Sequence, residues 1–295
     1  MTSRHHLHLS ATTGLILVGG AALIWSFGGT IARFIETPDS WAVVFWRSYF
    51  ATVFLLLFMG VRHGPQGTID HFRAMGWPGI IVGVCFAIAS TSFVVALAHT
   101  TVANILLMQA GAPLIAALLG FVLFREKVSL ATWLAIAAVI AGVAIMVSHS
   151  FKSEVSLLGD GLALVITIAF SIATVTTRRH NTIEMVPAVC LGVFLAGLFS
   201  GFMASSYSVS PADFAWLILF GAVNLGLGLA MFVTGARAVA APLAALISTL
   251  EPVFAPLWVW LIHAEVPATM TLLGGSVVFA ALLVHVLLQM RTAIR

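Results

Sequence analysis

Two ionisable residues, Arg47 and Glu251, lie inside long apolar stretches of this 295-residue sequence. A charged side chain at the centre of a bilayer costs about 2.5–3.5 kcal/mol on insertion scales, so each should face protein or water. An arginine at such a depth can bind a carboxylate, or it can extend to the membrane surface. A buried acid either titrates or pairs with a base, and the sequence is compatible with both for Glu251.

Three prolines add backbone acceptors near these residues. Pro113 cannot donate to the carbonyl of Gln109, because proline has no N–H group. Pro252 likewise leaves the carbonyl of Ser248 free, and Pro256 repeats the effect one turn later. In a membrane each freed carbonyl needs a side chain, a water or a substrate. We predict kinks at these prolines that either line a binding cavity or are purely mechanical.

Further polar, aromatic and thioether side chains occur at similar depths in the apolar stretches. A polar stripe in an apolar helix points into the bundle, where it lines a cavity or bonds a neighbouring helix. The predicted substrate-binding residues are Trp25, Ser26, Arg47, Ser90, Met108, Gln109, Ser171, Asn224, Ser248 and Glu251.

No pattern in the sequence predicts catalysis, a metal centre or a cofactor. Neither lysine follows a glycine, so the phosphate-binding loop of an ATP-driven pump is missing. His5, His6 and His8 form a short tail that we expect to be solvated. Cys85 and Cys190 fall in apolar stretches, where cysteine is usually a small apolar side chain. We expect no enzyme, no metal and no cofactor.

The composition assigns the chain to a membrane. Hydrophobic residues make up 61% and charged residues 8%, against about 25% charged residues in soluble domains, and the mean hydropathy is +1.12. A helix needs roughly 20 apolar residues to cross a bilayer. The sequence therefore predicts an all-α membrane protein with ten transmembrane helices, near 13–33, 41–61, 77–98, 102–123, 130–148, 158–177, 185–204, 213–235, 241–262 and 268–289.

The chain matches itself as two copies of one unit. Residues 102–126 match residues 241–265, with Pro113 opposite Pro252, and residues 14–33 match residues 159–178 at a slightly different offset. Each copy holds five spans, an odd number, so the second copy enters the membrane from the opposite side. We predict two inverted repeats, at 1–148 and 149–295.

The basic residues predict the orientation. With a cytoplasmic N-terminus, ten basic residues fall in inside connections, and only Arg33 and Lys152 fall outside. This is the asymmetry of the positive-inside rule. We expect both termini in the cytoplasm of a multi-pass plasma-membrane protein, which in a bacterium is the inner membrane.

The sequence resembles the drug/metabolite transporter superfamily, in its EamA-type branch of ten-span proteins made of two five-span repeats. The residues that carry the resemblance are Trp25-Ser26, Arg47, the segment from Pro113 to Ser129 and its copy from Glu251 to Glu265. The resemblance covers nearly the whole chain. It implies an exporter or exchanger of metabolites, with alternating access and a cavity lined mainly by spans 1, 3, 4, 6, 8 and 9. The second copy has Gly192 where the first has Arg47, which puts a symmetric ion-pair mechanism in doubt.

A zwitterionic or neutral metabolite fits these residues best. Phosphorylated sugars or nucleotide sugars would need two or more buried cations, and only Arg47 qualifies. One base, one acid, hydroxyls and the aromatic surface of Trp25, Phe86 and Phe170 suit an amino acid, including aromatic or apolar ones. We expect a monomeric secondary exporter whose partners are this substrate and the lipid bilayer, without nucleic acid. Multidrug or organic-cation efflux is the alternative carrier function, and a channel or scramblase is the non-carrier alternative.

Overall fold

The computed structural model describes residues 10–97, 99–100, 105, 108–125, 128–148, 157–264 and 266–293, and within these residues it contains helices and no strands. The tail with His5, His6 and His8, most of 98–107, and the paired Glu126 and Glu265 lie outside the described residues. The helices are α1 (Ala11–Ser26), α2 (Gly28–Ala32), α3 (Ser40–Ala74), α4 (Gly76–Leu97), α6 (Ala112–Phe124), α7 (Leu130–Val147), α8 (Leu157–Arg179), α9 (Val186–Met203), α10 (Pro211–Ile218), the π-helix η2 (Leu219–Leu227), α11 (Gly228–Ala236), α12 (Ala241–Ser248), α13 (Leu250–His263) and α14 (Thr269–Ala293).

Eight helical stretches in the described part of the chain are long and apolar enough to cross a membrane. Three of them join consecutive helices, namely α1–α2, α10–η2–α11 and α12–α13. Two shorter apolar helices cover Ala112–Leu123 and Leu130–Met146. The chain is therefore a helical membrane protein, as predicted, and each predicted span overlaps one of these ten segments.

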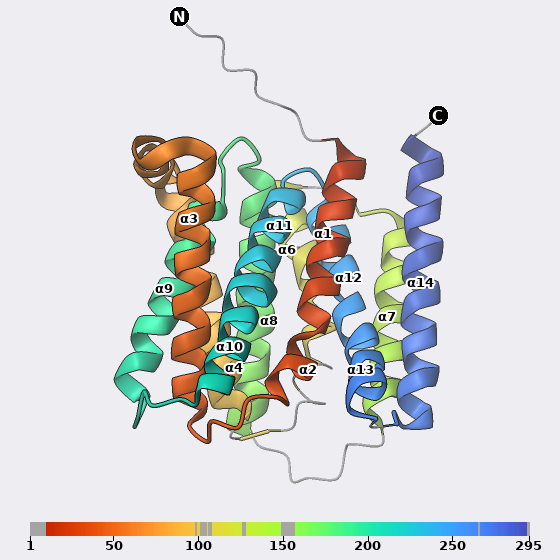
Figure 1. Cartoon of the computed structure of the whole chain (residues 1–295). Helices are drawn as coiled ribbons and strands as arrows, with labels where there is room; N and C mark the ends of the chain where they lie inside the picture. Colours follow the sequence, from red (N-terminus) through yellow and green to blue (C-terminus); the bar gives the residue numbers. More distant parts are fainter. Residues whose placement is uncertain are drawn as a thin grey trace, which may run out of the picture.

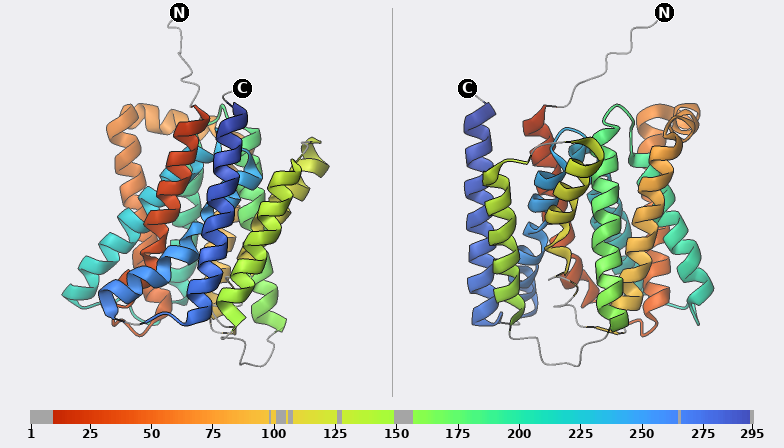
Figure 2. Two further views of the ribbon diagram at one scale, coloured as in Figure 1. Left: turned by 90° about the vertical axis from the view of Figure 1, so that its right-hand side faces the viewer. Right: turned by 180° about the vertical axis from the view of Figure 1, so that it is seen from behind.

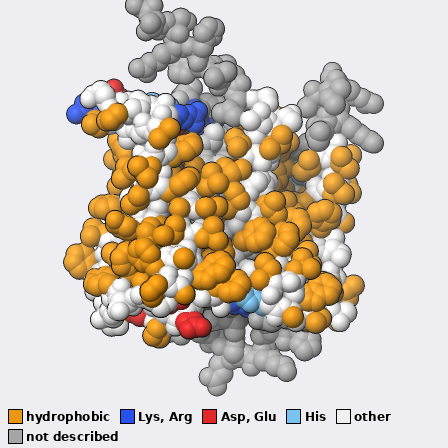
Figure 3. All heavy atoms as spheres, viewed as in Figure 1, with side chains coloured by type: hydrophobic (Ala, Val, Ile, Leu, Met, Phe, Trp, Pro, Cys, Tyr) orange, Lys and Arg blue, Asp and Glu red, His pale blue; other side chains and the backbone are white. Residues whose placement is uncertain are grey.

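The helices run side by side between two ends of one bundle (Figure 1). The first turn of α1 and the last turn of α14 lie at the same end (Figures 1 and 2). We call it the basic end, because α3, α8 and the residue after α11 bring basic side chains there, namely Arg62, Arg73, Arg178, Arg179 and Arg237. The opposite, acidic end holds Glu36, Asp39, Asp160 and Asp213. Figure 3 shows hydrophobic side chains covering the middle of one face, with the charged side chains near its ends, as a hydrocarbon core requires.

Helix α3 is longer than the predicted second span because it turns sharply at Gly64. Gly64 has φ 69° and ψ 172°, a left-handed conformation that glycine adopts without a Cβ clash. Pro65 follows, and its fixed φ suits the first position of a new helical segment. The segment after Pro65 turns across the basic end instead of continuing along the bundle (Figure 2).

Two carboxylates fasten the loops of the acidic end. Asp213 accepts hydrogen bonds from the Glu36 N–H at 3.0 Å and the Thr37 hydroxyl at 2.7 Å. Asp39 caps α3 through the Trp41 N–H at 2.9 Å. It also accepts from the N–H and hydroxyl of Ser205, at 2.7 Å each. The Ser205 hydroxyl is the main group that lowers the pKa of Asp39 to about 2, so this carboxylate is ionised at neutral pH.

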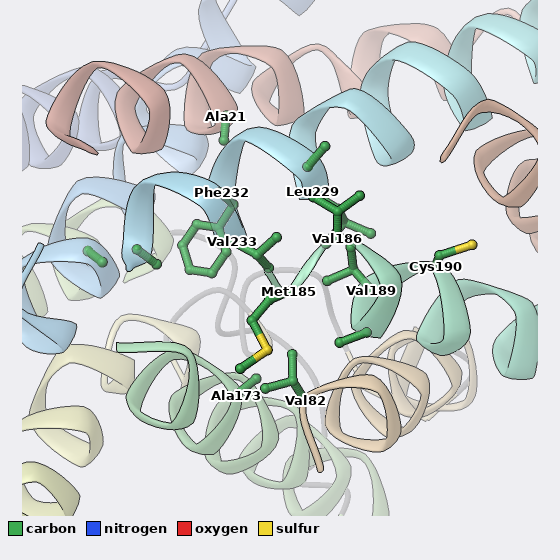
Figure 4. Close-up of a cluster of buried hydrophobic side chains, with 14 of the residues drawn as sticks. Ala21, Val82, Ala173, Met185, Val186, Val189, Cys190, Leu229, Phe232 and Val233 are labelled. Carbon is green, nitrogen blue, oxygen red and sulfur yellow. The ribbon is translucent and has the colours of Figure 1, made fainter. Parts of the chain in front are cut away.

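The core is closely packed where small residues let helices approach. Its largest cluster joins α1, α3, α4, α8, α9 and α11 around fully buried Phe232 (Figure 4). Gly83 on α4 faces Gly192 on α9, and a Cβ built on either glycine would come 2.7 Å from a backbone oxygen of the other helix. Cys85 and Cys190 are buried and make no disulfide, as predicted.

We expect Gly83→Ala to destabilise the protein by about 1–3 kcal/mol, because the new methyl group meets backbone that cannot rotate away. Thermal unfolding of the purified protein in detergent measures this change. Gly161→Ala is the matched control, since a Cβ at Gly161 meets nothing within 4 Å and alanine favours a helix. Equal stability of the two variants would contradict the packing argument.

Candidate functional site

A cavity of about 990 Å³ lies within the bundle, at the upper end of the roughly 300–1,000 Å³ that small-molecule sites occupy. Its walls come from α1 to α4, residues 109–112, α7, α8, α9, η2, α11, α12, α13 and the start of α14. Nine of the residues predicted from the sequence line it, namely Trp25, Arg47, Ser90, Gln109, Asn224, Ser248, Glu251, Pro252 and Pro256.

Arg47 projects from α3 into the cavity wall with unused hydrogen-bonding capacity. Its Nη2 lies 3.4 Å from the Ser90 hydroxyl, and its guanidinium lies 5.0 Å from the centre of the Phe220 ring. Its Nε is buried without a hydrogen-bond partner, and a buried donor left without a partner is costly. A carboxylate in the cavity would meet the positive charge of this guanidinium.

Glu251 reaches the same cavity from the first turn of α13. The N-terminus of a helix favours negative charge there. In the described part of the chain Arg47 and Glu251 make no direct ion pair, but they are close enough for their charges to interact. The cavity therefore offers an acid and a base that do not neutralise each other by contact.

Helix interruptions lie beside these charges. The chain breaks at Thr249 between α12 and α13, so Pro252 falls in the first turn of α13, and Pro256 lies inside that helix. Pro113 occupies the first turn of α6, after a turn at Ala110 and Gly111. Pro113 and Pro252 therefore lie at helix starts, where proline costs little, and only Pro256 interrupts the hydrogen bonding inside a helix.

A further helix break, at Phe27, separates α1 from α2 and was not predicted from the sequence. Asn224 donates from its amide to the carbonyl of Ile24 at 2.6 Å, and lies 3.4 Å from the carbonyl of Trp25. Asn224 belongs to the π-helix η2, a form that often marks functional sites. The Gly28-Gly29 pair after Trp25-Ser26 was the sequence signal for this break, since glycine disfavours a helix interior.

Four predicted residues do not line the cavity. Ser26 is fully buried and accepts a hydrogen bond from Trp258 Nε1 at 2.8 Å. The Ser171 hydroxyl lies 2.8 Å from the Thr167 carbonyl and 3.1 Å from that of Ala112. These two serines fasten helices to one another. Met108 does not line the cavity, and 36% of its surface is exposed. Pro113 is the second residue of α6, and only its neighbour Ala112 lines the cavity.

Aromatic side chains close the cavity toward the basic end. Trp25 lies 5.4 Å from Phe232, and Phe170 lies 5.1 Å from Phe232, between ring centres. Phe86 completes this aromatic floor at 6.3 Å from Phe170. Beyond Phe232 the buried cluster continues to residues of the basic end, such as Met185 and Val239. In the other direction the lining reaches Arg33, Val266 and Pro267 at the acidic end.

Several lining residues were not predicted from the sequence. Thr167, Phe220 and Thr249 contribute polar or aromatic surface. Thr167 stands one helical turn before Ser171 on α8, and that periodicity was its signal. Phe220 is one of 21 phenylalanines, and its position below the Arg47 guanidinium depends on how η2 packs against α3.

Comparison with known proteins supports the same fold. A solved crystal structure with 17% sequence identity superposes with a TM-score of 0.82, over 95% of this chain and 99% of that one. The pseudopaline exporter CntI of Pseudomonas aeruginosa (strain UCBPP-PA14) is 25% identical over 248 residues, or 81% of this chain and 83% of that protein. The sequence model of the EamA-like transporter family matches residues 12–148 and 157–287. The chain therefore belongs to the EamA-like transporter family of the drug/metabolite transporter superfamily, whose members are transporters and not enzymes.

Proposed function

We propose that this transporter is a secondary carrier that exports amino acids, including aromatic and apolar ones. The observation that carries the proposal is the placement of Arg47 and Glu251 on one cavity without a direct contact. An amino acid presents a carboxylate to the first and an ammonium group to the second. Its side chain would lie against the aromatic floor.

The export of a metabolite by a similar protein supports this direction of transport. The 25% identical relative is an exporter of pseudopaline. Organic-cation efflux is the second candidate, because Glu251 and the rings of Trp25, Phe86 and Phe170 would suit a cation. A channel is disfavoured, since the aromatic floor separates the cavity from the basic end.

We further propose ten spans arranged as two inverted repeats, at 1–148 and 149–295. One feature of the described helices and the family match support this arrangement. Helices α6 and α13 both end at a left-handed residue, Arg125 with φ 54° and Ala264 with φ 55°. Arg125 and Ala264 are as far apart in the chain as Pro113 and Pro252, so they occupy equivalent positions in the two proposed repeats. The family match also falls in two segments, residues 12–148 and 157–287.

The distribution of charge supports an orientation with the basic end in the cytoplasm. In this orientation both termini are cytoplasmic, and the chain is a multi-pass plasma-membrane protein, or an inner-membrane protein in a bacterium. The cavity then reaches the outer side through Arg33 and Pro267. We propose that the monomer works by alternating access, in which the aromatic floor opens while the acidic end closes.

Arg47→Ala should reduce the transport of carboxylate-bearing substrates roughly tenfold or more, because a charged hydrogen bond contributes about 1.5–3 kcal/mol. Organic cations should be transported as before. Uptake and counterflow in proteoliposomes with a panel of amino acids and organic cations, with and without a pH gradient, measure both. Arg73→Ala is the control, since Arg73 is exposed at the basic end. Equal losses for both substrate classes would indicate a structural role for Arg47.

Glu251→Gln should reduce the transport of every ammonium-bearing substrate, amino acids and organic cations alike, by a similar factor. The amide keeps the shape of the side chain and removes its charge, so the fold should be preserved. The same panel tests this variant, with Asp70→Asn at the exposed position 70 as its control. Unchanged transport of both classes would remove Glu251 from the site, and flux that does not saturate would favour a channel over a carrier.

A further inference from the structure

A second group of chemically capable side chains lies at the basic end, away from the cavity. His63, His71 and Glu184 place one ligand-type atom each within 4.8 Å of one another. The Oε2 atom of Glu184 lies 3.4 Å from His63 Nε2 and 3.1 Å from His71 Nε2. No metal site was expected from the sequence, in which His63 and His71 are eight positions apart and Glu184 lies in the other half of the chain.

The turn at Gly64 brings the two histidines together. His63 ends the straight part of α3, and the segment after Pro65 folds back so that His71 meets it. The two imidazole rings stack with their centres 4.2 Å apart. Glu184 comes from the connection between α8 and α9, so the group joins three segments of the chain.

The hydrogen bonding of His71 orients its ring as in a metal ligand. Its Nδ1 lies 2.7 Å from the carbonyl oxygen of Gly67, and a carbonyl only accepts, so Nδ1 carries the proton. The other ring nitrogen of His71, Nε2, therefore faces the Glu184 carboxylate and is the atom that can bind a metal ion in place of a proton. A histidine fixed in this way by a carbonyl is the usual arrangement of a metal ligand.

His63 adds a second free nitrogen to the group. Its Nε2 is buried and has no hydrogen-bond partner. Arg62 lies 3.9 Å from the other carboxylate oxygen, Oε1, and its side chain is 54% exposed, so it neither occupies Oε2 nor holds the carboxylate strongly. The Oε2 atom remains available between the two imidazoles.

We propose that His63, His71 and Glu184 form a binding site for a divalent transition-metal ion of the zinc class. Zinc bonds of about 2.0–2.1 Å to nitrogen and oxygen place neighbouring ligand atoms roughly 3.3–3.4 Å apart in a tetrahedron, and the two measured separations are close to this. Two imidazoles and one carboxylate suit Zn²⁺, Co²⁺ or Ni²⁺ better than Mg²⁺ or Ca²⁺, which prefer oxygen ligands.

The fourth coordination position is available to water or to a molecule from a neighbouring pocket. Glu184 also lines a pocket of about 720 Å³ at the basic end, together with Arg62, Thr234 and Arg237. A bound ion would fasten the end of α3 to the α8–α9 connection. This site shares no lining residue with the cavity and does not depend on the transported substrate.

Metal binding to the full-length protein in detergent tests the proposal. The protein is purified without a polyhistidine tag, with His5, His6 and His8 changed to alanine to remove a competing cluster. Calorimetric titration with ZnCl₂, and the visible absorption of bound Co²⁺, should both show one ion per chain. His71→Ala and Glu184→Gln should each weaken binding at least about tenfold.

His180→Ala is the matched control, because His180 lies in the same region but its Nδ1 faces the Thr176 carbonyl and its ring packs on Trp77. Its affinity for Zn²⁺ should equal that of the parent protein. X-ray absorption of the zinc-loaded parent protein needs no ligand variant and should show two imidazoles and a carboxylate oxygen. No binding by the parent protein, equal affinity in all variants, or a coordination sphere without imidazole would each overturn the proposal.

Discussion

The arrangement of this protein depends on the need to satisfy every backbone polar group inside an apolar bundle. At three helix interruptions a specific side chain forms a hydrogen bond with the nearby backbone. Asn224 donates to the carbonyls of Ile24 and Trp25 at the end of α1, and Ser171 lies within hydrogen-bonding distance of the carbonyl of Ala112, the first residue of α6. The Thr249 hydroxyl donates a hydrogen bond to the carbonyl of Leu246 at the end of α12. The cavity lies where these interruptions meet, because a continuous helix leaves no backbone group free for a ligand.

Asymmetry between the two proposed repeats gives the cavity its chemistry. Arg47 has Gly192 as its counterpart, and Gly192 packs so closely on α4 that a side chain would meet the Gly83 oxygen. Asn224 has Cys85 as its counterpart, and α4 is regular where η2 is a π-helix. The second proposed repeat thus has a closely packed glycine in place of the arginine, and the first has Ala112 in place of Glu251. The result is a site with one base and one acid from different helices.

Helix positions were predictable to a large extent, since apolar length and helix starts are local properties. The predicted spans near 158–177 and 185–204 correspond to α8 and α9. The turn at Gly64 was not predicted, because a glycine before a proline in a polar connection is compatible with a plain loop as well as with a folded-back helix. The break after Ser26 was missed for a similar reason, since its partner Asn224 is 200 residues away from Ile24.

The sequence by itself determined that the chain is a helical membrane protein of a transporter family, because hydropathy and family motifs are properties of consecutive residues. It also identified Arg47 and Glu251 as unusual, since a charge in an apolar stretch is visible without a fold. Only the tertiary structure decided which polar residues share a cavity and which fasten helices, as Ser90 and Ser26 show. It alone brought His63 and His71 to Glu184. The physical reason is that a serine or a histidine has the same local signal in either role, and its partner is set by packing between distant segments.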